Sequence, residues 1–466
     1  MAVRFSDDQV RQATQAHSGR PGARASYTEV STDSRQVSRD CLFVALRGER
    51  FDGHDFLSKA IEAGAAGLVV ELGRAVGIDA PEVAIYEVKN TLHALGGLAR
   101  FHRQRFKIPV GAVTGSNGKT TTKELVASIL AVRGRALKTE GNLNNEIGVP
   151  LTLFRLDPGH TAAIIEMGMN RPNEIRRLTD IARPDAGLVT VVQPAHLEGL
   201  GSIEGVAKAK GELFWGLGPT GTAVVNADDP RVVAEVRGLP SKTVTFGRGE
   251  AADVRLERAT PRGRSGLALR IVYQGQAHEV ALKLVGEHNA MNATGAFALA
   301  LALGYSPLEC QRGLEAAAPA RRRLELRDAP GGIAVLDDCY NANPGSMAAA
   351  LLTLKALAPS GHAVAVLGDM LELGPAEAQA HRRLGEEAAA SARQVAFLGP
   401  RSAEAFQVAR AHLGDGAAHF DDVDALVGWL KPALRDGDVV LVKASRGMRL
   451  ERVVDALMGE SSGGAH

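Results

Sequence analysis

The stretch that decides the fold is IPVGAVTGSNGKTTTKELVASIL, residues 108–130. An apolar strand, a loop of small residues and a helix-forming run follow one another in it, which is the order that a phosphate-binding loop requires. Gly115 and Gly118 allow backbone N–H groups to approach an anion, and the helix directs its positive N-terminal end at the same point. The stretch therefore predicts a mononucleotide-phosphate site. The alternative is a glycine-rich turn with an incidental surface lysine.

Lys119 and Thr120 have the most specific expected roles in this loop. The lysine would reach the β- and γ-phosphates of a nucleotide, and the threonine hydroxyl could hold a magnesium ion. The general motif begins with glycine where this chain has Val113, so the match rests on TGSNGKT between a strand and a helix. The expected nucleotide contacts are Thr114, Gly115, Ser116, Asn117, Gly118, Lys119, Thr120 and Thr121.

The length and charge of the chain limit its classes of function. Its 466 residues are enough for about three domains. The 54 basic and 53 acidic residues nearly cancel, so neither a nucleic acid nor a membrane surface is expected as a partner. Cys41, Cys310 and Cys339 form no C-x-x-C pair, which is typical of reduced cysteines in a cytoplasmic protein. We expect neither a signal peptide nor a membrane-spanning segment.

Two further strands of this region are predicted to end in polar side chains. The strand 162–165 ends at Glu166, and the strand 186–192 leads to His196. Because the carboxyl ends of parallel strands meet at one edge of a sheet, both side chains should lie beside the phosphate loop. Glu166 is therefore well placed for magnesium. A lone histidine is more often structural, but the position after such a strand favours a functional role for His196.

Two polar segments near this edge allow more than one interpretation. The loop after the phosphate-loop helix contains Asn142, Asn144 and Asn145. Their amides suit phosphate or sugar oxygens, but such a loop could equally cap the next helix. A later helical segment carries Lys208 and Lys210, which point in different directions, so at most one of them faces the site. From spacing alone, a solvated basic face is the alternative for these lysines.

The alternation of strands and helices predicts an α/β fold with three domains. The central domain is built on a parallel P-loop sheet, and the period-two pattern over 251–285 predicts strands added to it. The last domain alternates strand and helix strictly, which predicts a doubly wound, Rossmann-like parallel sheet. The predicted domains are 1–86, 87–318 and 319–466.

The outer domains have candidate binding segments of their own. In the N-terminal domain, the loops 32–35 and 47–54 combine hydroxyl, carboxylate, guanidinium and imidazole groups. They either bind a nucleotide base and a diphosphate or are two solvated turns. In the C-terminal domain, successive strands end at Asp337-Asp338, Gly368-Asp369 and Lys443-Ala444-Ser445-Arg446, so its polar edge is expected to be continuous.

Seven motifs occur in the order found in the Mur ligase family, which the chain resembles from Thr32 to Val454: TGSNGKTT, NLNNEIGVP, EMGMN, AHLEGLGS, AKAKGELF, NADDP and GEHNAMNA. DSR with LFVALRGERFDGH is similar to a module that binds the UDP end of the substrate. DDCYNANPGSM and LGDMLELG are similar to one branch of the family. The resemblance implies an ATP-dependent amide ligase that joins D-alanyl-D-alanine to UDP-N-acetylmuramoyl-tripeptide through an acyl phosphate, in the cytoplasmic stage of peptidoglycan synthesis.

The resemblance also implies catalytic roles. Lys119, Glu166, His196 and Lys210 would be the catalytic residues. Thr120 and Glu166 would hold one magnesium ion, and His196 would hold a second one together with the carbamate of Lys210. Carbamylation turns a cationic side chain into an anionic oxygen ligand of the kind that magnesium prefers. Burial of the lysine would supply the neutral amine that takes up CO₂.

Two sets of binding residues follow from the same resemblance. The further nucleotide contacts would be Asn289, Arg323, Asp338, Tyr340, Asn341 and Asn343. The substrate contacts would be Thr32, Asp33, Ser34, Arg35, Arg47, Gly48, Asp52, Gly53, His54, Asn142, Asn144, Asn145, Lys443, Ser445 and Arg446. We expect a cytoplasmic monomer that uses ATP, two magnesium ions and small-molecule substrates, with no nucleic-acid partner and no membrane insertion.

The chain departs from the family pattern at two places. Family members usually have asparagine shortly before the histidine of AHLE, where this chain has Thr190, Val191 and Val192. They usually have Gly-Arg where this chain has Arg322 and Arg323, so the nucleotide-binding arginine is fixed only to within one residue. Two other functions stay open: a different ligase of the family, similar to MurE or to a folylpolyglutamate synthase, and an ATP-binding switch that makes no bond.

Overall fold

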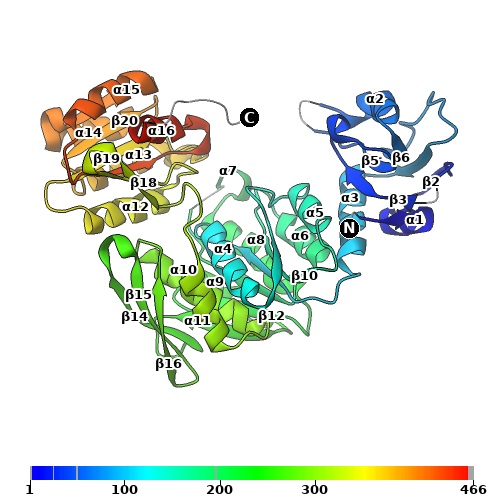
Figure 1. Ribbon diagram of the computed structural model, residues 1–466, viewed down its shortest axis with the longest axis horizontal. Coiled ribbons are helices and arrows are strands. Elements are labelled where there is room, and N and C mark those ends of the chain that lie inside the picture. The colour runs from blue at the N-terminus through cyan, green and yellow to red at the C-terminus, as the bar shows by residue number, and fades with distance from the viewer. Residues whose placement is uncertain (1–2, 25, 49–50, 195–196, 460–466) are drawn as a thin grey trace.

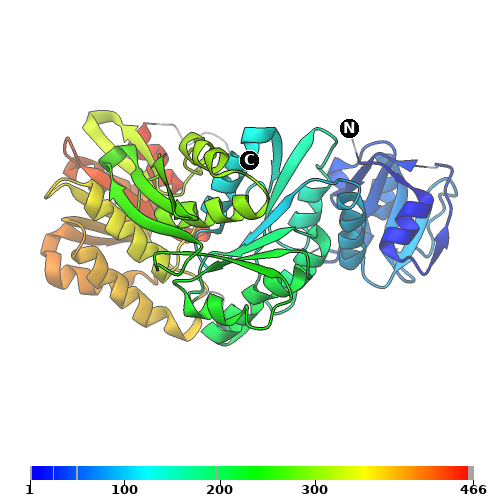
Figure 2. The same ribbon diagram turned by 90° about the horizontal axis from the view of Figure 1, so that it is seen from below.

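The computed structural model of the protein describes residues 3–24, 26–48, 51–194 and 197–459. Three lobes, each built on one large β-sheet, follow the order of the chain (Figure 1). Seen from below, the central lobe lies between the N-terminal and C-terminal lobes (Figure 2). The predicted α/β fold with three parts is therefore confirmed. The exact boundaries near residues 87 and 319 stay predictions.

The N-terminal lobe contains a five-stranded sheet with the order β2-β7-β6-β5-β4. Strands β4 to β7 pair in parallel, and β2 runs antiparallel at the edge beside β7. Strands β1 and β3 form a separate antiparallel pair. The elements are β1 (Phe5–Ser6), α1 (Asp7–Thr14), β2 (Ser18–Arg20), β3 (Ser26–Tyr27), β4 (Glu29–Ser31), β5 (Cys41–Val44), α2 (Leu57–Glu62), β6 (Ala65–Glu71) and β7 (Ala84–Val88).

The central lobe contains a nine-stranded sheet in which β8 is flanked by β10 and β11. Strands β8 to β14 pair in parallel, so their carboxyl ends meet at one edge. Strands β14 to β16 pair antiparallel and extend the sheet, which confirms the prediction for 251–285. The strands are β8 (Val110–Thr114), β9 (Arg135–Lys138), β10 (His160–Glu166), β11 (Ala186–Val189), β12 (Thr222–Asn226), β13 (Lys242–Gly247), β14 (Val254–Pro261), β15 (Leu267–Tyr273) and β16 (Gln276–Leu282).

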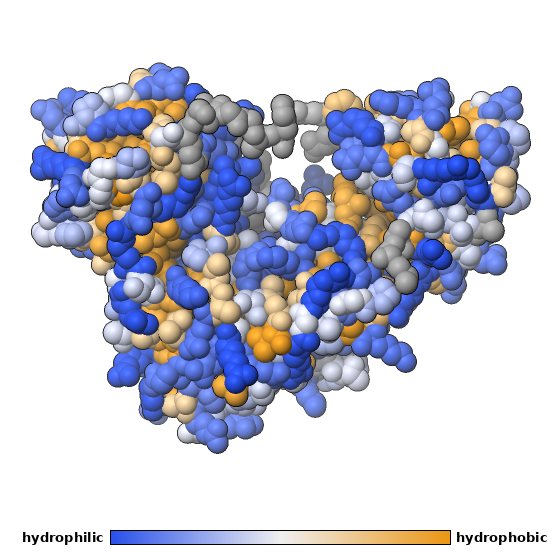
Figure 3. Space-filling view, viewed as in Figure 1, coloured by the Kyte–Doolittle hydropathy of each residue, from blue (hydrophilic) through white to orange (hydrophobic). Residues whose placement is uncertain are grey.

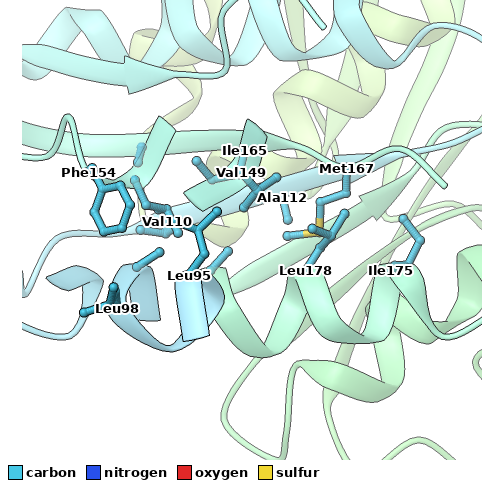
Figure 4. Packing of buried hydrophobic residues seen from close by; sticks show 14 of the residues in the cluster. Leu95, Leu98, Val110, Ala112, Val149, Phe154, Ile165, Met167, Ile175 and Leu178 are labelled. Atoms are coloured by element: carbon cyan, nitrogen blue, oxygen red, sulfur yellow. The ribbon is translucent and has the colours of Figure 1, made fainter. Parts of the chain in front are cut away.

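Helices cover both faces of this sheet. Successive side chains of β8 point to opposite faces, and because these side chains are apolar, both faces must be buried. Val110 and Ala112 belong to one hydrophobic cluster, and Val113 belongs to the other. Figure 4 shows the first cluster, where side chains of β8 and β10 pack against α3 and α6. Helices α4 and α10 supply the second cluster. The helices are α3 (Thr91–Arg103), α4 (Lys119–Leu130), α5 (Gly148–Leu153), α6 (Glu174–Ala182), α7 (Leu197–Leu200), α8 (Ile203–Gly216), α9 (Pro230–Ala234), α10 (His288–Ala302) and α11 (Pro307–Ala316).

The C-terminal lobe contains a six-stranded sheet with the order β17-β18-β22-β19-β20-β21. All of its strands pair in parallel except β17, which is antiparallel to β18. The expected doubly wound sheet is therefore present. The elements are β17 (Glu325–Ala329), β18 (Ile333–Asp337), α12 (Pro344–Leu357), β19 (Ala363–Gly368), α13 (Glu377–Ala389), β20 (Gln394–Leu398), α14 (Ala403–Leu413), β21 (Ala417–Phe420), α15 (Val423–Leu430), β22 (Val439–Lys443) and α16 (Glu451–Met458).

The lobes leave an open space between them on one side of the molecule. Figure 3 shows the surface hollowed above the central lobe, between the N-terminal and C-terminal lobes. On another side the hairpin of β14 and β15 reaches the C-terminal lobe, where Arg264 forms an ion pair with Asp328 of β17. Among the helices of the described residues, none has the length and apolar composition needed to cross a membrane.

Candidate active site

The phosphate loop connects β8 to α4, as the sequence predicts. Gly115 has φ of +148° and Gly118 has φ of +80°, a region that favours glycine. A Cβ atom on Gly115 would lie 1.8 Å from Oγ1 of Thr190, and one on Gly118 would lie 2.3 Å from Oδ1 of Asn292. Both positions therefore exclude a side chain. The N-terminal end of α4 begins directly after Gly118, where an anion would meet its free N–H groups.

Lys119 is held over the loop from which it projects. Its Nζ donates a hydrogen bond to the carbonyl oxygen of Gly115 at 2.8 Å. Burial lowers the pKa of Lys119, the Glu166 carboxylate acts in the opposite direction, and the Arg323 guanidinium lowers the pKa further. Two groups from distant segments of the chain, Glu166 and Arg323, therefore lie within electrostatic reach of Lys119. The carboxylate of Glu166 belongs to the central lobe. The guanidinium of Arg323 comes from the segment just before β17, the first strand of the C-terminal lobe.

Glu166 reaches the same edge of the sheet because β10 is the parallel neighbour of β8. The register sets Glu166 opposite Val113, one residue before the last residue of β8. Its side chain is buried, and Oε1 accepts a hydrogen bond from Nδ2 of Asn144 at 2.9 Å. Oε2 has no hydrogen-bond partner among the described residues. A buried carboxylate oxygen without a partner suits a hard cation such as Mg²⁺.

Lys210 is the second buried lysine of this region. It lies on the buried face of helix α8 and is only 2% exposed, while Lys208 on the same helix is exposed. The prediction that the two lysines point in different directions is therefore confirmed, and the role of Lys210 in the site stays a prediction. Burial lowers the pKa of Lys210 well below its usual value, and the positive charge of Lys119 lowers it further. No hydrogen bond or ion pair of its ammonium is recorded with another described residue.

The segment after β11 runs along the phosphate loop. The N–H of Ser116 donates to the carbonyl oxygen of Val191 at 2.8 Å, and Oγ of Ser116 donates to the carbonyl oxygen of Gln193 at 2.9 Å. Thr190, at one of the positions that depart from the family pattern, donates through Oγ1 to the carbonyl oxygen of Asn117. His196 and its neighbour Ala195 lie outside the described residues. The metal-binding role of His196 therefore stays a prediction.

Two asparagine side chains join the phosphate loop to the C-terminal lobe. Nδ2 of Asn343 donates to Oδ1 of Asn117 at 2.7 Å, and Nδ2 of Asn117 donates back to Oδ1 of Asn343 at 3.1 Å. Nδ2 of Asn117 also donates to Oε1 of Gln193. Asn343 is the N-cap of α12, where its Oδ1 also accepts from the N–H of Ser346. The loop that would hold phosphates thus contacts the third lobe directly.

Three segments of the chain match domains of one family in chain order. Residues 26–103 match the Mur ligase family catalytic domain, residues 113–300 the Mur ligase middle domain, and residues 322–446 the Mur ligase glutamate ligase domain. The UDP-N-acetylmuramoyl-tripeptide–D-alanyl-D-alanine ligase of Escherichia coli (strain K12) is 40% identical over 440 residues, which cover 94% of this chain and 95% of that protein. This chain belongs to the Mur ligase family. It is an ATP-dependent ligase, and its family acts in peptidoglycan synthesis.

Solved Mur ligases share the arrangement of the whole chain. MurF from Acinetobacter baumannii has a TM-score of 0.88 and 32% identity, covering 98% of this chain and 100% of that chain. A MurF ligase from Thermotoga maritima, solved as a complex with ADP, has a TM-score of 0.82 and 29% identity, covering 93% and 97%. The family resemblance inferred from the seven motifs is therefore confirmed. The roles of individual residues stay predictions.

The nucleotide contacts predicted for this Mur ligase lie on both sides of the junction between two lobes. Asn289, at the start of α10, donates through Nδ2 to the carbonyl oxygen of Val285 at 2.7 Å. The Arg323 guanidinium lies 4.3 Å from the ring centroid of Tyr340, a stacking contact. Arg322 instead forms an ion pair with Glu451 and has φ of +60°. That conformation favours glycine, the residue that the family usually has before this arginine, so the predicted nucleotide contact stays Arg323.

The predicted residues of the C-terminal lobe lie at one edge of its sheet. Strands β18, β22 and β19 are neighbours, so the polar segments that follow them are adjacent. Nζ of Lys443 lies 2.6 Å from Oδ2 of Asp338 and donates to the carbonyl oxygen of Asn341 at 2.8 Å. Oγ of Ser445 accepts from the N–H of Leu371 at 3.0 Å, while Arg446 is more than half exposed. Arg446 lies 3.8 Å from Glu451 and over the ring of Tyr340, and it is more exposed than Lys443 and Ser445.

The predicted substrate residues of the N-terminal lobe are partly engaged inside that lobe. Asp33 accepts hydrogen bonds from the guanidinium of Arg35, which lower its pKa to about 2. Nδ1 of His54 donates to Oδ1 of Asp52 at 2.6 Å, and Nε2 accepts from the N–H of Glu71 at 3.0 Å. Both ring nitrogens of His54 are thus occupied. Residues 49 and 50 of the same loop lie outside the described residues. Substrate contact stays a prediction for Thr32, Ser34, Arg47, Gly48 and Gly53.

The asparagine-rich loop provides hydrogen bonds to the start of the next helix, and its contact with a ligand stays a prediction. Oδ1 of Asn145 accepts from the N–H groups of Ile147 and Gly148, so this residue caps the start of α5. Asn142 is exposed and free to meet a ligand. The family resemblance implies a substrate contact for Asn144, and in the structure its side-chain amide donates a hydrogen bond to Glu166. The three neighbouring asparagines therefore face three different surroundings.

Sequence reasoning did not single out three residues of this site. Lys123 lies one helical turn after Lys119 and 3.9 Å from Oε2 of Glu166. The side chain of Asn292 lies next to the backbone of Gly118, and the side chain of Gln193 accepts a hydrogen bond from Asn117. For Lys123 a signal exists, because residues four apart share a helix face, and a lysine on a buried face requires a partner. The other two positions carry no such local signal.

Proposed function

We propose that this Mur ligase joins D-alanyl-D-alanine to UDP-N-acetylmuramoyl-tripeptide with the conversion of ATP to ADP and phosphate. The observation that carries the proposal is the meeting of Lys119 and Glu166 at one sheet edge, in a chain 40% identical to an Escherichia coli ligase of that name. The reaction would take place in the cytoplasm, on a monomer. No helix of the described residues could span a membrane, which is compatible with substrates that dissolve in water.

The chemistry requires two anions to approach each other. The γ-phosphate of ATP must be attacked by the peptide carboxylate, so their repulsion has to be offset. Lys119, the loop amides and the N-terminal end of α4 supply fixed positive potential at this point. When bound, magnesium would neutralise further phosphate charge, with Thr120 and Glu166 holding one ion and His196 with carbamylated Lys210 holding the other.

The burial of Lys210 supports its modification by CO₂. Attack on CO₂ requires a neutral amine, and burial lowers the pKa of Lys210 well below its usual value. The product is a carbamate, which replaces a buried unpaired cation by an anion suited to a metal. No carboxylate of the described residues forms an ion pair with its ammonium, and the charge that acts on it comes from Lys119. This lysine is therefore more compatible with the modified state than with a structural ion pair.

The remaining residues would position the reactants. The nucleotide would bind between α10 and the edge of the C-terminal sheet, with Asn289 and Arg323 on opposite sides. The UDP end of the substrate would contact the loops 32–35 and 47–54, and its peptide would reach toward Asn142 and Arg446. Attack of a carboxylate oxygen on the γ-phosphorus of ATP forms an acyl phosphate and releases ADP. The amine of D-alanyl-D-alanine then attacks the carbonyl carbon of the acyl phosphate, phosphate leaves and the amine loses a proton, while closure of the lobes keeps water away.

An amine-specificity assay tests this proposal. Protein, ATP, Mg²⁺ and UDP-N-acetylmuramoyl-tripeptide are mixed with D-alanyl-D-alanine, diaminopimelate, lysine or glutamate, and phosphate release is measured. We expect release with D-alanyl-D-alanine alone. Release with one of the other amines would assign a different ligase of the family. Release that does not depend on any amine would indicate an ATP-hydrolysing switch.

A further inference from the structure

The Glu166 carboxylate has one occupied and one unoccupied oxygen. Oε1 accepts the hydrogen bond of Asn144 at 2.9 Å, and Oε2 is buried without a hydrogen-bond partner among the described residues. The ammonium of Lys123 lies 3.9 Å from Oε2. The donor and acceptor of an N–H···O hydrogen bond lie about 2.7–3.2 Å apart, so Lys123 and Glu166 are near each other but form no hydrogen bond. The oxygen proposed to meet a metal therefore has a second cation next to it.

Lys123 is fixed in this position by other partners. Its Nζ donates to the carbonyl oxygen of Thr139 at 2.7 Å and lies 3.1 Å from Oε1 of Glu124. Its side chain is as deeply buried as that of Glu166. Because charges attract more strongly in a buried setting than in water, a rotation of the carboxylate toward Lys123 would form a tight pair. That pair would occupy Oε2.

Asn144 is anchored so that it opposes this rotation. Its carbonyl oxygen accepts a hydrogen bond from the N–H of Gly168, two residues after Glu166, at 2.8 Å. The backbone of Asn144 is thus tied to the segment that follows β10, and its side chain is directed at Oε1. A neutral amide holds one oxygen of the carboxylate without cancelling its charge, whereas an ammonium would cancel it.

We propose that Asn144 is a positioning residue that keeps the Glu166 carboxylate away from Lys123, so that Oε2 stays available to the metal that accompanies the nucleotide. This inference rests on the proposed function and adds a role for a residue expected to contact substrate. Lys123 is the competing cation. Removal of the amide should let the carboxylate turn to Lys123 and weaken metal binding, and removal of the lysine charge should restore it.

The test measures metal binding instead of turnover. Mn²⁺ is titrated into the protein saturated with ADP, and free Mn²⁺ is followed by electron paramagnetic resonance. Asn144→Leu, which has a similar size but no donor, should weaken Mn²⁺ binding about 10- to 100-fold, the range for partners that orient a metal ligand. The double variant Asn144→Leu with Lys123→Gln should return to within about threefold of the wild type.

Two further variants keep the test decisive. Lys138→Met removes a cation that pairs with Glu124 and not with Glu166, so it is the matched control for charge and should leave Mn²⁺ binding unchanged. Lys123→Met replaces Lys123→Gln if the glutamine variant does not fold. Thermal unfolding of each variant shows whether it is native before Mn²⁺ is added.

Each outcome decides the question. Weakened binding in Asn144→Leu that the second substitution restores supports the positioning role. Unchanged binding in Asn144→Leu overturns it, and so does a loss that removal of the Lys123 charge fails to restore. In both of these cases the wild type still binds Mn²⁺ with ADP, so the ligase proposal is untouched. A wild type that binds no Mn²⁺ with ADP overturns the metal-dependent function together with this inference.

Discussion

At the scale of single residues, basic groups gather around the phosphate loop before any ligand arrives. Glu166 and Arg323 both act on the charge of Lys119, and Lys119 acts on Lys210. Burial disfavours positive charge here and lowers the pKa of both lysines, whereas a triphosphate would favour that charge. The residues are therefore arranged for a ligand more than for the stability of the empty protein.

Lys119 should be needed for turnover, because it supplies a positive charge where phosphate charge shifts. Lys119→Met is expected to lower kcat about 10²- to 10³-fold, the range observed when one transition-state donor is removed. Phosphate release in the complete assay measures this. Lys208→Met, which removes an exposed lysine, is the control and should behave as the wild type. A Lys119→Met variant with more than half of the wild-type rate would contradict the assignment.

Lys210 should act through an anionic oxygen that short carboxylates can replace. Lys210→Ala is expected to lose activity by about 10²-fold or more, since a metal ligand is lost. Formate or acetate in the assay buffer should restore part of the activity, because a small carboxylate can enter the space of the carbamate. Full activity of the variant without added carboxylate would exclude the carbamate role.

The buried amine of Lys210 should also make stability depend on pH. Its pKa is lowered by folding, so the unfolded chain binds the proton more tightly, and the native state loses stability as pH falls below the unfolded pKa of about 10.4. Lys210→Met should therefore raise the free energy of unfolding at pH 8 in CO₂-free buffer. The gain should shrink toward zero at pH 11. Denaturant unfolding at the two pH values measures it, and a gain that grows with pH would have the wrong sign.

At the scale of elements, the turn between β8 and α4 is fixed by two glycines and by neighbours from other segments. The left-handed conformation of Gly118 and the approach of Asn292 leave no room for a Cβ atom. The strand sets where the turn begins, and the helix sets where its N–H groups point. Phosphate binding is therefore a property of the strand, turn and helix together.

Gly118→Ala tests this element. A left-handed alanine costs about 1–2 kcal/mol, and the contact with Asn292 adds to it. We expect the free energy of unfolding to fall by about 1–3 kcal/mol and ADP affinity to fall at least tenfold. Gly249→Ala is the matched control, because no atom lies within 4 Å of its Cβ position. Calorimetric titration of ADP distinguishes the two variants, and equal affinities would contradict the role of the turn.

At the scale of the whole molecule, the predicted nucleotide contacts come from the central and the C-terminal lobe, while the predicted catalytic residues all belong to the central lobe. The pair of Asn117 and Asn343 and the pair of Arg264 and Asp328 connect the central and C-terminal lobes. Because nucleotide contacts are predicted on both sides of this junction, binding should change the angle between the lobes.

Small-angle X-ray scattering measures that change. We expect the profile of the protein with an ATP analogue and UDP-N-acetylmuramoyl-tripeptide to differ from that of the free protein, as the C-terminal lobe rotates onto the central one. Glu166→Gln with the same ligands should change less, because it weakens the proposed metal site. Superimposable profiles of the free and the ligated wild type would contradict domain closure.

Much of the fold could be predicted because its signals are local. The strand, loop and helix of 108–130 follow one another in the chain, and Glu166 directly follows its strand. Since parallel strands end at one edge, their order alone brings Glu166 to the phosphate loop. The spacing of Lys208 and Lys210 does not decide which of them is buried, because the helical period gives the direction of a side chain but not what packs against it.

The sequence by itself determined the three α/β lobes, the phosphate loop and the carboxylate beside it, since each depends on residues that are neighbours in the chain or on adjacent strands. Only the tertiary structure decided that Asn117 meets Asn343, 226 residues away, and that Asn144 holds Glu166 beside Lys123. The physical reason is that a hydrogen bond between side chains requires a distance of about 3 Å between the donor and acceptor atoms. Packing of distant segments sets such distances, and no local pattern encodes them.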